Sequence, residues 1–169
     1  MVVEWMQRVM ISTRPDDQTL ADFPTRVRRR VCPSLHRIAQ PIGGFAQCVM
    51  VTDEFVGIVD RELQRFTSDL ESLGFRREPV SALKLHRDGR KSVGSWVKRS
   101  SVLAEKQLHV TLFARNATSI EVFAHWEYSW IRHPLRHYRA SGWDTQTGVE
   151  MMRELLSSCG ISLRSGPMT

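Results

Sequence analysis

Two segments near the middle of the chain alternate polar and apolar side chains, with only four residues between them. Residues 107–114 and 119–126 both have a period of two, which is typical of a strand with one buried face. The four intervening residues suit a short turn, so we expect an antiparallel hairpin. The side expected to face the core is formed by Leu108, Val110, Leu112, Ile120, Val122, Ala124 and Trp126.

A second hairpin is expected just before the first. Residues 82–87 and 91–98 flank Asp88-Gly89-Arg90. The Asp-Gly pair tolerates a positive φ, which the tightest hairpin turns require. The sequence therefore predicts four strands that follow one another along the chain.

A helix is expected on each side of these strands. Residues 54–73 repeat apolar side chains at steps of three and four, Asp53 can cap the start, and Gly74 can end the helix. Residues 147–159 repeat in the same way. The apolar stripes are Phe55, Ile58, Val59, Leu63, Phe66, Leu70 and Leu73 in the first helix and Val149, Met152, Leu155, Leu156 and Cys159 in the second.

The sequence offers more than one capping residue for the start of the second helix. Asp144, Thr145 or Thr147 can cap its start, and Thr147 with Glu150 fits a capping box. Gly160 ends it, and residues 161–163 suit a short strand. Residues 129–143 give no clear structural pattern.

The element order is thus α-β-β-β-β-α. It predicts an α+β fold of two layers, in which a four-stranded antiparallel meander has both helices on one face. Residues 50–163 form this single domain, and residues 164–169 form a loose tail. Many unrelated functions share such folds, so the fold alone identifies none.

Residues 1–49 differ from the rest of the chain. They have no sustained period, several turn-forming residues and a basic run at 26–30, so we expect a poorly structured basic segment. Two interpretations stay open. The segment is a basic arm that docks on the domain or a partner, or translation begins at Met50 and the segment is an over-extended reading frame.

The length and composition of the chain limit the kind of protein that it can be. The 169 residues suit one domain with a core. There is no apolar run of roughly 18 residues, as a membrane span requires, and no signal-peptide pattern, so we expect a cytoplasmic protein. The three cysteines are odd in number and lack a CxxC spacing, which argues against a disulfide framework and a zinc–thiolate site. Cys159 is expected to be a small buried hydrophobe.

A net charge of +6 permits binding to nucleic acid or another polyanion. Residues 125–139 mix arginines, histidines and aromatics. Arginine can grip phosphate, and exposed aromatics can stack on bases. The proposed binding residues are Lys98, Arg99, Trp130, Arg132, Arg136, Tyr138 and Arg139. The structural alternative is that the aromatic side chains anchor this connection to the core, while the arginines are exposed to solvent and bind no ligand.

The histidines suggest a metal site. If Val110 pairs with Ala124, His109 lies directly across from His125 on the face opposite the core. His86 could join them from a third strand, and Glu127 follows two residues after His125. Imidazoles with a carboxylate can bind zinc or another borderline metal, although cross-strand histidines also occur without metal.

His133 and His137 are four residues apart, but Pro134 permits a helix through them only if the helix starts there.

The segment Leu108-His109-Val110-Thr111-Leu112 resembles one copy of the His-x-Thr motif of two-histidine phosphoesterases. That chemistry needs two motifs, one imidazole acting as base and the other as acid. The nearest partner, His125-Trp126-Glu127, lacks the hydroxyl residue. The resemblance implies a phosphodiester-acting enzyme as an alternative.

The chain has no GxGxxG, P-loop, GxSxG, HExxH or EF-hand pattern. We therefore expect a non-enzymatic binding domain that needs no cofactor and binds nucleic acid or another polyanion. The main alternative is a protein-interaction module or homodimer that uses exposed aromatics as hot spots. The enzyme alternative depends on His109 and His125.

Overall fold

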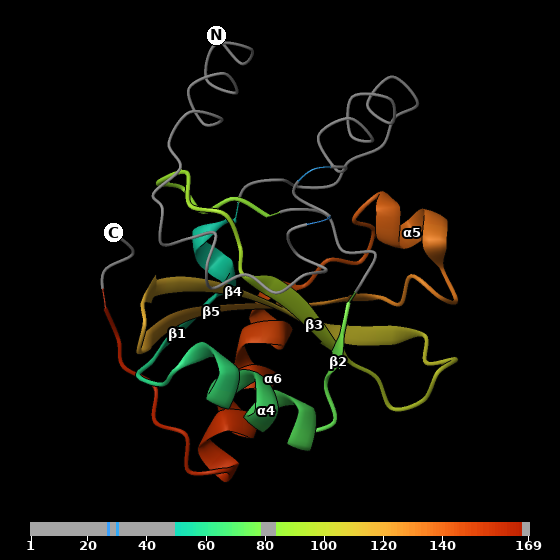
Figure 1. Cartoon of the computed structure of the whole chain (residues 1–169). Coiled ribbons are helices and arrows are strands. Elements are labelled where there is room, and N and C mark those ends of the chain that lie inside the picture. The colour runs from blue at the N-terminus through green and yellow to red at the C-terminus, as the bar shows by residue number, and fades with distance from the viewer. Residues whose placement is uncertain (1–26, 28–29, 31–49, 79–83, 167–169) are drawn as a thin grey trace, which may run out of the picture.

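The computed structural model describes residues 50–78 and 84–166, together with Val27 and Arg30. Within these residues the chain is an α+β domain built on one five-stranded antiparallel sheet (Figure 1). The spatial order is β1-β5-β4-β3-β2. The strands are β1 (Phe55–Val59), β2 (Arg76–Arg77), β3 (Gly94–Lys98), β4 (Lys106–Asn116) and β5 (Ser119–Tyr128).

The helices divide between the two faces of the sheet. The 3-10 helix η2 (Thr52–Glu54) precedes β1. Two longer helices, α4 (Leu63–Ser72) and α6 (Thr145–Ser158), lie on one face, and the short α5 (Pro134–Tyr138) lies on the other side (Figure 1). Among the described residues, no helix has the length and apolarity needed to cross a membrane.

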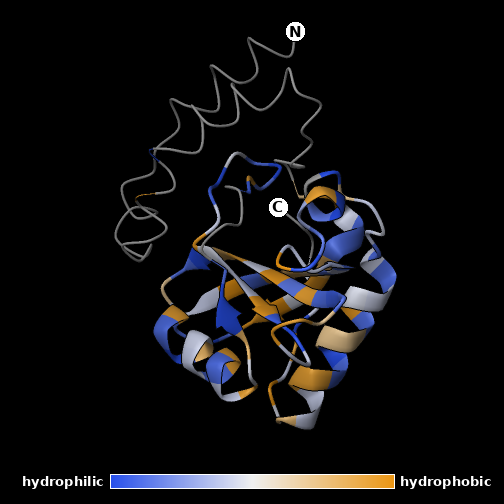
Figure 2. Ribbon diagram, turned by 90° about the vertical axis from the view of Figure 1, so that its right-hand side faces the viewer, coloured by the Kyte–Doolittle hydropathy of each residue, from blue (hydrophilic) through white to orange (hydrophobic). Residues whose placement is uncertain are grey.

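The main core fills the space between the sheet and the helices α4 and α6. Every second residue of β4 and β5 points into it, as the alternation predicted, and Phe66, Leu70, Met152 and Leu156 meet them from the helices. Hydrophobic residues accordingly gather where the sheet and these helices meet (Figure 2). The opposite face of the sheet carries the other half of each alternation, which is mostly polar but includes Phe113 and Phe123, and these two rings pack with Met50 and Phe55 in a smaller apolar cluster.

The β4–β5 hairpin has the predicted register. Val110 pairs with Ala124, and His109 pairs with His125. β4 continues two residues into the predicted turn and ends at Asn116, whose side chain accepts a hydrogen bond from the backbone N–H of Thr118, and β5 begins at Ser119 as predicted.

The predicted helix over residues 54–73 is wrong in its first half. Residues Phe55–Val59 form β1, which pairs with β5, and the helix begins only at Leu63. β1 is buried on both faces, so its apolar residues form a run without period two. Such a run also fits a helical stripe, which explains the error. The order of the main elements is therefore β-α-β-β-β-β-α, with α5 inserted before the last helix.

The first predicted hairpin is only partly present. Its turn is confirmed, since Gly89 has φ +87° and Asp88 accepts a hydrogen bond from the backbone N–H of Arg90. Of the strand predicted at 82–87, the described part pairs by one isolated bridge, Leu85 with Lys91, and residues 82–83 lie outside the described residues. The outer partner of β3 is instead β2.

The second helix has the predicted extent within two residues. Asp144 is its cap, because its carboxylate accepts from the backbone N–H and the hydroxyl of Thr147. Thr145 and Thr147 lie inside the helix, so the other two capping choices and the capping box are wrong. Cys159 is exposed rather than buried, because it follows the last turn and points away from the core.

The remaining predictions concern the ends of the domain. Gly74 and Gly160 have positive φ and end their helices as predicted. In place of a strand at 161–163 there is one bridge between Arg164 and Ile58, so Arg164 is paired rather than loose. Val27 and Arg30 are helical and exposed, and the rest of the segment predicted to be irregular lies outside the described residues.

Candidate functional site

The polar face of the sheet is buried although its residues are hydrophilic. Strands β4 and β5 place alternate side chains there, and these include Gln107, His109, Thr111, Glu121, His125 and Glu127, all of which are almost inaccessible to solvent. Buried ionisable groups are costly unless they are paired or bind a ligand. This face is therefore where the chemistry of the domain is concentrated.

His109, His125 and Glu127 form the most compact cluster on this face, which we call the buried centre. Their exposed fractions are 3%, 1% and 2%. The His109 Nδ1 atom lies 3.1 Å from His125 Nε2 and 3.1 Å from Glu127 Oε1, and His125 Nε2 lies 3.4 Å from Glu127 Oε2. Direct pairing across the hairpin brings the two imidazoles together, as the sequence predicted.

These spacings match those of metal ligands. Zinc bonds to nitrogen or oxygen are about 2.0–2.2 Å long, so two ligands of a tetrahedral site lie roughly 3.3 Å apart. All three donor atoms of the buried centre lie within 4.8 Å of one another. The residues could thus bind one ion without rearrangement of the strands.

Neighbouring polar groups hold the carboxylate of Glu127 in place. The Gln107 side-chain amide donates to Oε1 at 2.7 Å, and His137 Nδ1 lies 3.1 Å from Oε2. His137 comes from α5, and the same nitrogen contacts the backbone carbonyl of Tyr128 at 3.1 Å. Both carboxylate oxygens therefore have fixed partners.

His125 has a second set of neighbours on its other side. Its Nδ1 atom lies 3.6 Å from Glu54 Oε1, and its ring stacks on Trp143 with centroids 3.6 Å apart. Lys84 Nζ lies 4.6 Å from the centroid of the Trp143 ring. Neither His125 Nδ1 nor Glu54 Oε2 has a hydrogen-bond partner in the structure. A carboxylate beside the outer nitrogen of a histidine is the usual environment of a metal-ligating imidazole.

Burial and charge set the protonation states of these groups. Burial lowers the pKa of His125 to about 3 and raises the pKa of Glu54 to about 7. Burial also acts to raise the pKa of Glu127, but the adjacent His109 and His125 outweigh it and hold that pKa well below its usual value. At neutral pH the centre thus offers a neutral imidazole at His125 and an ionised carboxylate, the forms that bind metal.

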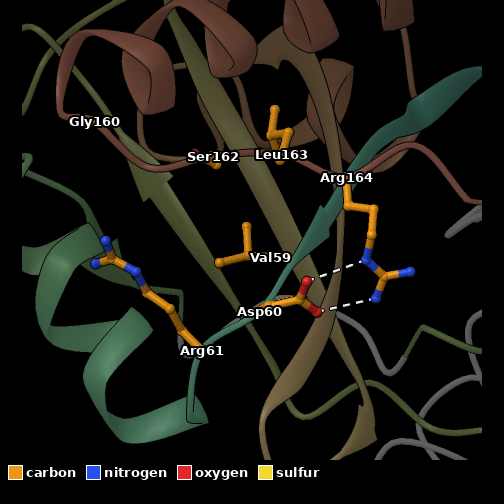
Figure 3. Close-up of a pocket in the computed structure, with 7 residues that line it drawn as sticks. All are labelled: Val59, Asp60, Arg61, Gly160, Ser162, Leu163 and Arg164. Carbon is orange, nitrogen blue, oxygen red and sulfur yellow. Dashed lines mark hydrogen bonds and ion pairs between the residues drawn. The ribbon is translucent and has the colours of Figure 1, made fainter.

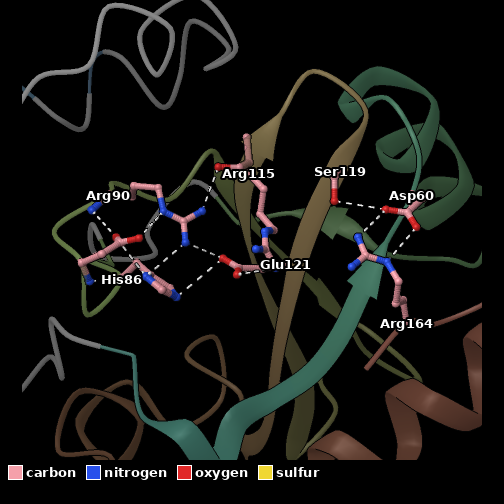
Figure 4. Close-up of polar contacts among 9 residues, drawn as sticks. Asp60, His86, Arg90, Arg115, Ser119, Glu121 and Arg164 are labelled. Carbon is pink, nitrogen blue, oxygen red and sulfur yellow. Dashed lines mark hydrogen bonds and ion pairs between the residues drawn. The ribbon is translucent and has the colours of Figure 1, made fainter. Parts of the chain in front are cut away.

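His86 belongs to a different cluster on the same face (Figure 4). Its Nε2 atom lies 3.5 Å from Glu121, which also receives a hydrogen bond of 2.7 Å from Arg90. The Phe123 ring packs edge-on against His86 and precedes His125 on the same face of β5. The structure therefore does not bring His86 to the buried centre.

The residues proposed for polyanion binding do not form one surface. Arg99 and Trp130 lie together, but both bond to the buried carboxylate of Glu78, at 3.0 Å and 2.7 Å. Lys98 points to the helix side of the sheet, where it donates to the carbonyl of Leu73. These three residues are thus engaged inside the molecule.

The other proposed residues lie on or near α5. Arg132, Arg136 and Arg139 are exposed, and the Arg136 guanidinium lies 5.0 Å from the centroid of the Tyr128 ring. Tyr138 is the last residue of α5, and its side chain lies outside what the structure describes.

Several partners of the buried centre were missed from the sequence. Gln107 could have been found from the same period of two that identified His109. Glu54 was assigned to a helix, and Trp143 lay in a connection without a pattern. Only the tertiary fold brings these last two residues to His125.

A hollow of about 280 Å³ lies between β1 and the chain that follows α6 (Figure 3). Its charged residues are already paired, Arg164 with Asp60 and Arg61 with Asp69. The hollow therefore offers no buried group in need of a ligand.

The comparisons with known proteins assign no family and no function to this chain. No family model matches the sequence, no curated protein matches it significantly, and no solved structure matches its fold significantly.

Proposed function

We propose that this domain binds a divalent metal ion of the zinc class through His109, His125 and Glu127. One observation carries the proposal: His109, His125 and Glu127 are buried and each place one donor atom within 4.8 Å of the other two, and His109 Nδ1 lies 3.1 Å from both His125 Nε2 and Glu127 Oε1. The separation is that of ligands around a single tetrahedral ion. Two imidazoles and one carboxylate favour a borderline metal such as zinc, cobalt or nickel over calcium or magnesium.

The surroundings of the centre support the same proposal. The ligands stand on two paired strands, so the sheet keeps them in place before a metal arrives. Gln107 orients the carboxylate, and Glu54 faces the outer nitrogen of His125. These are the supporting contacts that metal ligands in proteins usually have.

Phosphodiester chemistry has less support. In the segment that resembles a His-x-Thr motif, the hydroxyl of Thr111 faces Ser95 Oγ at 3.4 Å. Thr111 and Ser95 pair directly across the β3–β4 ladder, whereas His109 pairs with Val97. We therefore favour metal binding over a two-histidine phosphoesterase.

The test is a titration of chelator-treated protein with Zn²⁺ and with Co²⁺, followed by calorimetry and by absorption. We expect one ion per chain, and we expect the His109→Ala, His125→Ala and Glu127→Gln variants to lose at least about 100-fold in affinity, more than is typical for loss of a supporting contact. Circular dichroism of each variant checks that it folds. No stoichiometric binding by the native protein would refute the proposal, as would unchanged binding by folded variants.

A second candidate function, polyanion binding, is favoured by the position of three arginines. Arg132, Arg136 and Arg139 are exposed on or near α5, whereas Arg99 and Trp130 are bonded to Glu78. The proposed surface is thus reduced to the α5 region.

Binding to DNA and RNA across a salt series tests this second function. A steep fall of affinity with salt, abolished by changing all three arginines to Glu, would support it. Binding that persists in the triple variant would show that the surface is wrongly assigned. A complex with a protein or a second copy that depends weakly on salt would favour the interaction module instead.

A further inference from the structure

His137 is the third imidazole beside the carboxylate of Glu127. Its Nδ1 atom lies 3.1 Å from Glu127 Oε2, the same oxygen that lies 3.4 Å from His125 Nε2. His109 contacts the other oxygen. Three histidines from β4, β5 and α5 thus surround one buried carboxylate.

We propose that His137 is the fourth protein ligand of the metal site, so that metal binding fastens α5 to the sheet. This inference rests on the proposed function. With His137 the ligand set is three imidazoles and one carboxylate, which fills a tetrahedral site. A site filled by four protein ligands is typical of structural rather than catalytic zinc.

The local structure explains why His137 reaches the centre. Pro134 occupies the first turn of α5, where its fixed φ and missing N–H are tolerated, and His133 precedes it. Four residues after His133, the backbone N–H of His137 donates to the His133 carbonyl. The neighbouring side chains of Leu135 and Arg136 are exposed, whereas His137 is partly buried and turned toward Glu127.

The segment around α5 is anchored at both ends. Ahead of the helix, the backbone N–H of Ser129 donates to Glu105 and the Trp130 indole donates to Glu78. Behind it, Asp144 pairs with Trp126 of β5 through two backbone hydrogen bonds. A five-residue helix has little stability of its own, so its position depends on such contacts and on the His137–Glu127 contact between them.

Coordination requires His137 to approach His109 and His125 and to change its tautomer, because among the described residues the donor atoms within 4.8 Å of one another are those of His109, His125 and Glu127. Its Nδ1 now faces two acceptors, the carbonyl of Tyr128 and the carboxylate of Glu127, and therefore carries the proton. On metal binding, the ring takes its other neutral tautomer: the proton passes to Nε2, and the Nδ1 lone pair binds the ion. The Tyr128 carbonyl then loses this hydrogen bond.

The experiment compares Co²⁺ binding by the native protein, His137→Ala and the control His133→Ala. His133 lies on the same connection, is partly buried and is 4.0 Å from the exposed Glu105. We expect His137→Ala to weaken binding at least about 100-fold and to change the visible cobalt spectrum, because water replaces a nitrogen ligand. Millimolar imidazole should restore the native spectrum in His137→Ala. His133→Ala should match the native protein in both measurements.

The outcomes separate this inference from the proposed function. If native protein and His137→Ala bind cobalt with the same spectrum, the three-residue site stands and His137 is not a ligand. A weaker affinity with an unchanged spectrum and no rescue by imidazole would also overturn the inference, since His137 would then only position Glu127. If the native protein binds no metal, the proposed function itself fails.

Discussion

The four buried glutamates, Glu54, Glu78, Glu121 and Glu127, differ in the partners that compensate their charge. Glu121 has Arg90 and Glu78 has Arg99, so each pairs with a guanidinium. Glu127 has imidazoles and an amide instead, and its partner His125 is held neutral by burial. Glu54 also lacks a guanidinium, but burial raises its pKa to about 7, whereas the pKa of Glu127 is held well below its usual value. Glu127 is therefore the ionised buried carboxylate that a metal ion would stabilise most.

The Arg90–Glu121 pair should contribute far more to stability than a similar pair on the surface. Glu121 is fully buried, and Arg90 donates to it at 2.7 Å (Figure 4). We expect Arg90→Ala to lower the free energy of unfolding by about 3 kcal/mol, because it leaves a buried charge without its closest partner. Denaturant unfolding measures the loss.

The matched control is Arg164→Ala, drawn in the same figure. Arg164 pairs with Asp60 at 3.0 Å, but both side chains are more than half exposed, so the change should be within experimental error. Adding Glu121→Gln to Arg90→Ala should recover part of the loss. Equal effects of the two arginine variants would contradict the role given to burial.

At the scale of elements, the sequence predicted best those strands that have one polar face. The alternation in β4 and β5 gave their extent, their register and the meeting of His109 with His125, because a slip of one residue would bury the wrong side chains. β1 was missed because it is buried on both sides and its run of apolar residues has no period of two. Glu54, which ends η2, was therefore missed with it.

The packing of α6 on β5 depends on one glycine that the sequence did not single out. Gly148 lies in the first turns of α6, where an added Cβ would come within 2.6 Å of the backbone nitrogen of Trp126 and closer still to the backbone of His125. A strand backbone cannot move aside as a flexible side chain can. The helix and the strand that carries the buried centre are thus in direct backbone contact.

We expect Gly148→Ala to destabilise the domain. Alanine favours the helix by about 1 kcal/mol, but overpacking against a backbone typically costs about 1–3 kcal/mol, and here the contact is severe. Thermal unfolding should show a lower midpoint. The control is Ser157→Ala, an exposed position of the same helix, which should change the midpoint little. A more stable Gly148→Ala variant would mean that α6 can shift freely on the sheet.

For the molecule as a whole, the sheet separates two layers that respond differently to pH. The apolar layer between the sheet and helices α4 and α6 contains the main core. The other layer buries groups whose pKa values are displaced in opposite directions. The pKa of His125 falls to about 3, whereas that of Glu54 rises to about 7, in both cases chiefly through burial.

The two groups therefore oppose each other in their effect on stability. Between about pH 3 and pH 6.5 the unfolded chain binds a proton at His125 that the native protein does not, so stability falls with falling pH. Between pH 4.5 and about pH 7 the native protein keeps a proton on Glu54 that the unfolded chain loses, so stability falls with rising pH. Between pH 4.5 and pH 6.5, where both ranges overlap, the two opposite changes of the unfolding free energy with pH partly cancel.

Replacing Glu54 with glutamine should separate these contributions. Glutamine resembles the protonated carboxyl and cannot ionise, so the variant lacks the penalty that the native protein acquires as Glu54 loses its proton. We expect the unfolding free energy of Glu54→Gln, relative to native protein, to increase between pH 5 and pH 8 by on the order of 2 kcal/mol. Denaturant unfolding of both proteins at the two pH values, with a chelator present, measures it. A constant difference between them would mean that Lys84, which acts to lower the pKa of Glu54, fully compensates its buried charge.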